Sequence, residues 1–211
     1  MFHVKHEGPT RPHWEDAVPH LALSADQAAQ MDRYEQLLTE RAVPLGMVAA
    51  SDLPRLRQRH LLDCLRGAPL LPKGLLADLG SGAGLPGLVL AIARPDVHVV
   101  LTERRRNRAA FLELAVDEIG LGNAEAHPGR AEDLVGGRFA AVSARAFADA
   151  RASWAVAEPL LEPTGILLYW AGSGFDPGSE APSGVSITVS ETPFEVPGLA
   201  RPGPVVIMAR Q

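Results

Sequence analysis

Short apolar runs alternate with helical segments along the chain from residue 75 onward. The runs GLLADLG (74–80) and VHVVLTE (97–103) have the length and composition of buried strands. The segments GLVLAIARP (87–95) and NRAAFLELAVDEIGL (107–121) have the spacing of helices that follow them. Because strands that alternate with helices in this way pair in parallel, the pattern predicts an α/β fold with helices on both faces of the sheet.

The alternation continues through the C-terminal half of the chain. Further strands are expected at NAEAHPG (123–129), FAAVSARA (139–146) and GILLYWAG (165–172), with a helix at ASWAVAEPLL (152–161). The tail segments GVSITVSETPFEV (184–196) and GPVVIMAR (203–210) are joined by a Pro/Gly-rich loop and are expected to close the sheet as an antiparallel pair. The sheet is therefore predicted to be mostly parallel, with one antiparallel strand near the end.

The segment before the first strand has helical character. Ser24 followed by Gln27 is a capping-box pattern at the start of an amphipathic helix, and Ser51 is the expected N-cap of a second helix that runs to Arg66. We expect arginines on the polar side of this second helix: Arg55, Arg57, Arg59 and Arg66. The predicted organisation is a flexible N-terminal arm (1–20), a helical cap (21–73) and an α/β domain (74–211) that forms one unit with the cap.

Composition excludes several classes of protein. The single cysteine, Cys64, excludes an intramolecular disulfide and a thiolate-rich zinc site, and no metal site is expected. A formal net charge of −5 argues against a basic coat for nucleic acid, although a local basic patch is compatible with it. No apolar stretch is long enough for a membrane helix, and the first residues lack the apolar core of a secretory signal. We expect a cytoplasmic protein.

The most informative motif is the glycine-rich segment ADLGSGAGLPG (77–87). Gly80, Gly82 and Gly84 follow a strand that ends in Asp78. In an open parallel sheet, ligands bind outside the carboxyl ends of the strands, and glycines there let the backbone approach the ligand closely. The motif therefore predicts a ligand-binding turn.

Three ligands compete for this turn. A phosphate loop requires Gly-Lys-Ser/Thr, and the segment contains no lysine. A dinucleotide fingerprint counted from Gly80 has Leu85 at its third glycine, and the frame through Gly82, Gly84 and Gly87 starts two residues late. For S-adenosylmethionine, Asp78 can set the loop or meet the ammonium, and Glu103 is placed to accept from both ribose hydroxyls. A nicotinamide cofactor remains the alternative, since Glu103 suits its ribose too.

Four motifs together resemble the RsmG/GidB family of small-subunit rRNA guanine-N7 methyltransferases. They are RHLLD (59–63), DLGSGAGLPGLVLAIARP (78–95), RAED (130–133) and ARAFA (144–148). The resemblance covers about residues 24 to 211 and implies a Rossmann-like methyltransferase sheet with a helical N-terminal cap. It also implies methyl transfer from S-adenosylmethionine to N7 of one guanine in 16S rRNA.

The resemblance and the loop analysis together give a set of candidate site residues. The candidate cofactor-binding residues are Asp78, Gly80, Gly82, Gly84, Leu85, Glu103, Ala131, Glu132 and Arg145. Arg145 and His60 are candidates for orienting the substrate, because guanine N7 carries a free lone pair and needs no general base. His60 is also compatible with a buried structural network, and Asp63 with holding His60 or an arginine.

Arginines are the candidate contacts to RNA. They are Arg59, Arg104, Arg105, Arg106 and Arg108, and each is equally compatible with a solvated helix face paired with acidic residues. The expected partner is small-subunit rRNA, free or in the assembled subunit, and the expected state is a monomer. An unstacked or loop guanine is the expected target, because duplex RNA hides N7 in a deep groove.

Departures from the family pattern leave a third possibility, a non-catalytic relative that binds cofactor or RNA. Ala171 stands where a lysine is usual, Ala140 where an aspartate is common, Ala144 in place of serine and Pro44 in place of asparagine. The missing lysine removes one cationic contact to RNA or substrate.

Overall fold

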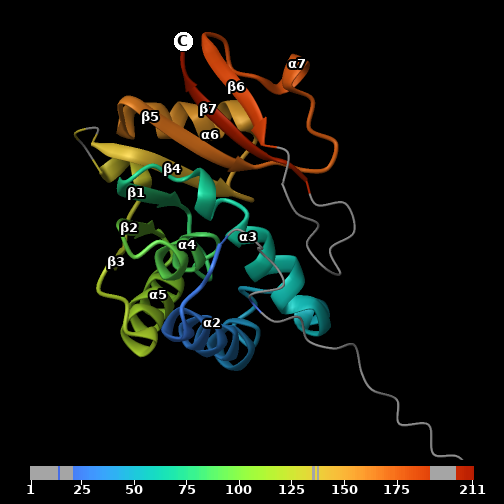
Figure 1. Cartoon of the computed structure of the whole chain (residues 1–211), viewed down its shortest axis with the longest axis vertical. Helices are drawn as coiled ribbons and strands as arrows, with labels where there is room; N and C mark the ends of the chain where they lie inside the picture. The colour runs from blue at the N-terminus through green and yellow to red at the C-terminus, as the bar shows by residue number, and fades with distance from the viewer. Residues whose placement is uncertain (1–13, 15–20, 135, 137, 191–202) are drawn as a thin grey trace, which may run out of the picture.

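The computed structural model describes residues 14, 21–134, 136, 138–190 and 203–211. These residues form one seven-stranded sheet in the order β3-β2-β1-β4-β5-β7-β6 (Figure 1). Its strands are β1 (Gly74–Leu79), β2 (Val97–Thr102), β3 (Ala124–His127), β4 (Phe139–Arg145), β5 (Leu161–Trp170), β6 (Val185–Ser190) and β7 (Val205–Arg210). β7 runs antiparallel to both of its neighbours, and the other pairs are parallel. The predicted sheet, mostly parallel with one antiparallel strand near the end, is confirmed.

Helices cover both faces of this sheet. The helices are α2 (Ala25–Leu37), α4 (Gly87–Ala93), α5 (Arg106–Ile119), α6 (Ala150–Ala157) and the short α7 (Pro177–Glu180). Side chains from α2, α4 and α5 share one buried core with Leu76 of β1, whereas Trp154 of α6 belongs to a second core with Ala77 and Leu79. Because successive side chains of a strand point to opposite faces, β1 supplies both cores.

Helix α2 begins where the sequence predicts it. The Gln27 backbone N–H donates to Ser24 Oγ at 3.2 Å, and the Ser24 N–H donates to Gln27 Oε1 at 2.9 Å, which completes the capping box. The chain continues as a π-helical turn, η1 (Leu38–Ala42). α2 buries Met31 and Tyr34 against the sheet domain and packs on α4 and α5, so the cap and the sheet share one core.

The second cap segment is not the continuous α-helix that the sequence predicts. It consists of a 3-10 helix η2 (Ala50–Arg55), a π-helical turn η3 (Arg57–Leu62), the short α3 (Asp63–Leu65) and a 3-10 turn η4 (Ala68–Leu70). Ser51 lies inside the first turn and is not its N-cap. Pro54 disfavours α-helical geometry in the preceding residue and so accounts for the 3-10 geometry of η2, but not for the π-helical turn that follows.

The expectation of an exposed arginine face on this segment is also wrong in part. Arg57 is 6% exposed; its Nε donates to Glu35 at 2.8 Å, its guanidinium pairs with Asp32, and it stacks on the Trp14 ring at 3.8 Å. Arg66 is buried as well and donates to Asp63 at 2.8 Å. Both arginines hold the cap together, and neither faces solvent.

Two tryptophans attach separate segments to the cap. Trp14 is buried and its indole N–H donates to Asp32 at 3.1 Å, so this residue of the expected flexible arm is docked. The rest of that arm, 1–13 and 15–20, lies outside the described residues, as do residues 191–196 of the expected tail strand. Trp170 of β5 donates its indole N–H to the Asp63 carbonyl at 3.0 Å and so fastens the cap to the sheet.

Candidate functional site

The glycine-rich turn lies at the topological switch point of the sheet. The strand order reverses between β1 and β4, which places the loops that follow these two strands on either side of a crevice. Gly80, Gly82 and Gly84 have φ of +59°, +59° and +94°, which other residues adopt only with strain. The glycines are therefore required by the shape of the turn.

Side chains and backbone from neighbouring elements fix this turn. The Gly80 N–H donates to Thr102 Oγ1 at 3.2 Å, and the Ser81 N–H donates to the Thr102 carbonyl at 2.8 Å. From the other side, the buried Tyr34 hydroxyl of α2 donates to the Ala83 carbonyl at 2.7 Å. The loop is thus held by α2 of the cap on one side and by β2 on the other.

Asp78 lies fully buried beneath the turn. Its carboxylate accepts from Ser143 Oγ at 2.7 Å and from the Gly87 backbone N–H at 3.2 Å. Burial raises the pKa of Asp78 to about 6, although the hydrogen bond from Ser143 and the one from Gly87 oppose this shift. Of the two roles left open by the sequence, these contacts support the setting of the loop.

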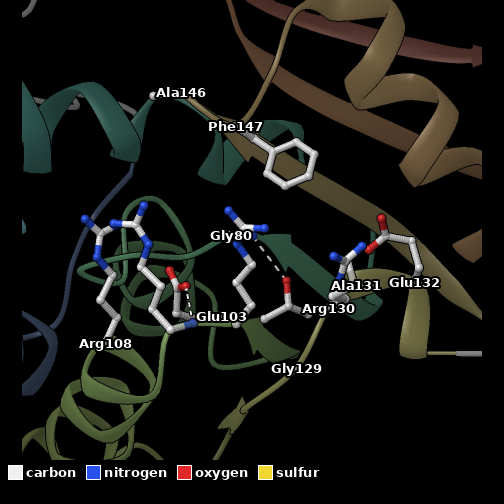
Figure 2. A pocket seen from close by; sticks show the side chains of 12 residues that line it. Gly80, Glu103, Arg108, Gly129, Arg130, Ala131, Glu132, Ala146 and Phe147 are labelled. Carbon is white, nitrogen blue, oxygen red and sulfur yellow. Dashed lines mark hydrogen bonds between the residues drawn. The ribbon is translucent and has the colours of Figure 1, made fainter.

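A pocket of about 370 Å³ opens beside the turn (Figure 2). Its lining residues come from the ends of β1, β2, β3 and β4: Gly80, Thr102, Glu103, Arg104, Arg105, Arg108, Gly129, Arg130, Ala131, Glu132, Ala146 and Phe147. The volume falls within the range of small-molecule sites. The structure therefore brings together the predicted residues Gly80, Glu103, Ala131 and Glu132 in one pocket.

Glu103 is held in place at the end of β2. Its backbone N–H donates to the His127 carbonyl at 3.1 Å, and its Oε1 accepts from the Arg105 backbone N–H at 2.8 Å. The residue is 5% exposed. Figure 2 shows Glu103 and Glu132 at different ends of the pocket. A carboxylate fixed in this way is suited to accept hydrogen bonds from a bound polyol.

Other residues predicted to touch the cofactor do not line this pocket. Gly84 lies against Leu88 and the Tyr34 hydroxyl, so a Cβ there would clash within the fold. Leu85 is partly buried on the core beneath the turn. Gly82 faces more open space, with the Arg108 guanidinium near the position of its missing Cβ. Gly84 and Leu85 therefore pack toward the core and help to set the conformation of the loop.

Arg145 and His60 are also outside the pocket lining, but the structure brings them together. Arg145 Nε donates to Asp63 at 3.3 Å, and its Nη2 donates to the Arg59 carbonyl and to His60 Nδ1, each at 3.2 Å. His60 Nε2 lies 2.9 Å from Asp52 Oδ2. This network connects the end of β4 to the cap directly beside the pocket.

The contacts of His60 define its protonation. Arg145 can only donate, so Nδ1 accepts, and Nε2 carries the hydrogen that Asp52 accepts. Burial, followed by the charge of Arg145, lowers the pKa of His60, although Asp52 opposes the shift. His60 is therefore neutral at pH 7 and is a structural partner of Arg145.

The arginines that follow Glu103 differ from those of the cap. Arg104, Arg105 and Arg106 are exposed and Arg108 is half-buried, and none forms an ion pair with any residue that the structure describes. Arg104, Arg105 and Arg108 line the pocket, while Arg106 begins α5. We call Arg104, Arg105 and Arg108 the rim arginines.

A family model described as "GidB: rRNA small subunit methyltransferase G" matches residues 27–178. The chain belongs to the GidB family. The ribosomal RNA small subunit methyltransferase G of Nocardioides sp. is 45% identical over 164 residues, which cover 74% of this chain and 65% of that protein. The protein of the same name from Stenotrophomonas maltophilia is 38% identical over 188 residues, 88% of each chain.

Solved structures with the same fold are more distant in sequence. A methyltransferase from Podospora anserina, PaMTH1, solved with S-adenosylhomocysteine, has a TM-score of 0.54 and 15% identity over 87% of this chain and 88% of that chain. A methyltransferase from Geobacter sulfurreducens also has a TM-score of 0.54, with 17% identity over 86% of this chain and 88% of that chain. These neighbours confirm the predicted Rossmann-like sheet, and the GidB family does not favour the oxidoreductase alternative.

The departures from the GidB pattern lie at different depths in the fold. Ala140 and Ala144 are buried in β4, and a Cβ on Gly74 would lie 3.0 Å from the Ala140 Cβ. Ala171 follows β5, and its N–H pairs with the Pro204 carbonyl at 3.0 Å. Pro44 is exposed on the cap. Ala140 and Ala144 are thus accommodated by the packing of the sheet.

Five residues that line the pocket were not among the candidate site residues: Thr102, Gly129, Arg130, Ala146 and Phe147. Arg130, Ala146 and Phe147 lie within the RAED and ARAFA motifs, and Phe147 is an exposed large apolar residue. Within the described ranges, no group of three or more His, Cys, Asp or Glu side chains is arranged to hold a metal ion. No helix of those ranges is both long and apolar enough to cross a membrane.

Proposed function

We propose that the protein transfers a methyl group from S-adenosylmethionine to N7 of a guanine in 16S rRNA. The observation that carries this proposal is the fixed carboxylate of Glu103 beside the glycine turn, in a chain of the GidB family. S-adenosylmethionine supplies an electrophilic sulfonium methyl group.

The residues of the pocket fit this cofactor. A Cβ on Gly80 would lie 2.9 Å from the Phe147 ring, so glycine is required for this ring to pack against the turn. We assign Glu103 to the ribose hydroxyls and Ala131 and Glu132 to the adenine, because all three line this pocket. The exposed backbone of the turn would receive the amino-acid end of the cofactor.

The residues of the site are expected to catalyse methyl transfer by positioning the guanine base. Guanine N7 has a lone pair on its open edge and attacks without losing a proton. The protein must then hold N7 in line with the methyl group, and such alignment contributes a large part of the rate. We assign Arg145 and His60 to positioning, because their network fixes the end of β4 from which Ala146 and Phe147 enter the pocket.

The rim arginines and Arg106 are assigned to the RNA backbone. The rim arginines line the pocket and form no ion pair with the described residues, so they can bind phosphates next to an inserted nucleotide, and Arg106 follows them at the start of α5. Arg59, which is exposed but near Asp52 at 3.4 Å, is a secondary contact. We place the protein in the cytoplasm as a monomer, with the cap (21–73) and the sheet domain (74–211) acting as one unit.

A methyl-transfer assay tests the proposal. Purified protein, labelled S-adenosylmethionine and small ribosomal subunits from a methylation-deficient strain should give label at N7 of a guanine in 16S rRNA. Naked 16S rRNA in a parallel reaction distinguishes free RNA from the assembled subunit as substrate. Label that appears only on another atom, or no label with either substrate, would reject the proposed function.

A further inference from the structure

Phe147 is unusual among the large apolar side chains of the described residues. It is 37% exposed, and the other exposed large apolar residues (Leu45, Leu53, Leu75 and Val189) lie outside the pocket. The residue thus combines an aromatic ring, exposure to solvent and a position in the functional site. Exposure of an aromatic ring in a binding site indicates a ligand that covers it.

The backbone that presents this ring is strained. Ala146 has φ of +53°, and no other residue except glycine has a positive φ in the described part of the chain. A left-handed alanine is retained only where the surrounding structure enforces it, and such positions concentrate at functional sites. Here the network of Arg145 with Asp63 and His60 fixes the preceding residue, so the strain serves to direct Phe147 toward the pocket.

Within the pocket, Phe147 follows β4, whereas Glu103, Ala131 and Glu132, which are assigned to the adenosine, follow β2 and β3. Its ring is next to Gly80, and Figure 2 shows it on the opposite side of the pocket from Glu103. Glu103 and the segment 129–132 form the other walls. The ring follows β4, packs against Gly80 of the glycine turn and is still 37% exposed, so part of it is open to a ligand in the pocket.

We propose that Phe147 stacks on the target guanine and holds its ring plane for methyl transfer. The inference rests on the proposed function and adds the residue that orients the base. Unstacked RNA bases are recognised by aromatic side chains, and the rim arginines beside this ring supply the phosphate contacts that would deliver such a base. An exposed phenyl ring offers a face to the purine without competing for N7.

Three variants separate stacking from packing. Phe147→Ala should lower kcat/KM for small ribosomal subunits by about 5- to 150-fold, the range for loss of one base-stacking contact. Phe147→Leu keeps an apolar side chain without an aromatic face and should be similarly impaired, whereas Phe147→Tyr should stay within about threefold of wild type. Leu53→Ala, which removes an exposed apolar side chain from the cap, is the matched control and should not change the rate.

Cofactor affinity provides the second measurement. The dissociation constant for S-adenosylhomocysteine should change by less than about threefold in Phe147→Ala, because the ring contacts the base and not the adenosine. Full activity of Phe147→Ala or Phe147→Leu would overturn the stacking role, as would a loss of cofactor affinity as large as the loss of activity. If wild type itself transfers no methyl to guanine N7, the proposed function fails instead.

Discussion

Two groups of arginines, one in the cap and one at the pocket rim, show how the same side chain serves different purposes. In the cap, Arg57 and Arg66 are buried and form ion pairs with carboxylates of the same region. At the rim, Arg104 and Arg105 are exposed and unpaired among the described residues. Burial and pairing show that the first group holds the cap together, and exposure leaves the second group accessible to the RNA phosphates that we propose as its partners.

This contrast cannot be obtained from the number of arginines in each segment. The cap sequence RLRQRHLLDCLR and the loop sequence ERRRNR are both rich in arginine. What differs is the availability of acidic partners, since α2 presents Asp32 and Glu35 to the cap arginines. The rim is next to a pocket with two glutamates, Glu103 and Glu132, and Glu103 is held by a backbone N–H.

The largest effect is expected in the cap. Arg57→Ala removes the partner of Glu35 and the cation that stacks on Trp14, and should lower the free energy of unfolding by about 3–5 kcal/mol. Urea denaturation measures this change. Arg55→Ala, an exposed position two residues earlier, should change stability by less than about 0.5 kcal/mol. Equal stability of the two variants would show that the burial and ion pairs of Arg57 do not stabilise the cap.

Asp78 is a third kind of ionisable group in this fold. It is buried like Arg57, but its partners are hydrogen-bond donors and not an oppositely charged side chain. Its pKa of about 6 lies above the ordinary value of 3.8, so the folded state binds a proton more tightly than the unfolded state. The stability contributed by this group is present below pH 3.8 and is lost as pH rises through 6. The cost of ionising it amounts to about 3 kcal/mol at pH 7.

The variant Asp78→Asn tests this assignment. The difference in unfolding free energy between Asp78→Asn and wild type should shift in favour of the variant by up to about 3 kcal/mol between pH 4 and pH 7. Asp117→Asn, an exposed position on α5, controls for the loss of a carboxylate. A pH-independent difference would show that Asp78 is not a buried titrating group.

The rim should affect binding without affecting stability. Replacement of Arg104, Arg105 and Arg108 by alanine should weaken binding of 16S rRNA by about 10- to 100-fold at low salt, with unchanged unfolding. The dependence of log affinity on log salt should become shallower by about 2–3, since each phosphate contact contributes nearly one. Replacement of the same three arginines by lysine should keep most of the salt dependence of RNA binding. If the alanine variant had the same salt slope as wild type, the rim arginines would not contact the RNA phosphates.

The fold could be predicted from the sequence because local patterns and tertiary structure agree. Apolar runs of strand length alternate with helical segments, and the capping box at Ser24 starts α2 at the predicted place. The second cap segment was mispredicted in part because apolar spacing does not register Pro54, which disfavours α-helical geometry within η2. Pairing of Arg57 with α2 depends on tertiary contact, which local periodicity does not contain.

The site was predictable where it depends on backbone and sheet topology. The glycine turn and Glu103 follow β1 and β2, and strands of a parallel sheet end at one edge, so their meeting in a pocket could be inferred. The separation of Gly84 and Arg145 from the pocket could not, because it depends on which side of each loop faces inward. The strained backbone of Ala146, which presents Phe147, likewise has no local sequence signal.

The most direct test of this account is calorimetric titration of the pocket with S-adenosylhomocysteine. Wild type should bind it, and Glu103→Ala should weaken binding by about 1–3 kcal/mol, the scale for hydrogen bonds to a charged group. Glu113→Ala, an exposed carboxylate on α5, should bind as wild type does. Binding of nicotinamide dinucleotides instead, or equal affinity in Glu103→Ala and wild type, would contradict the assignment of this pocket to S-adenosylmethionine.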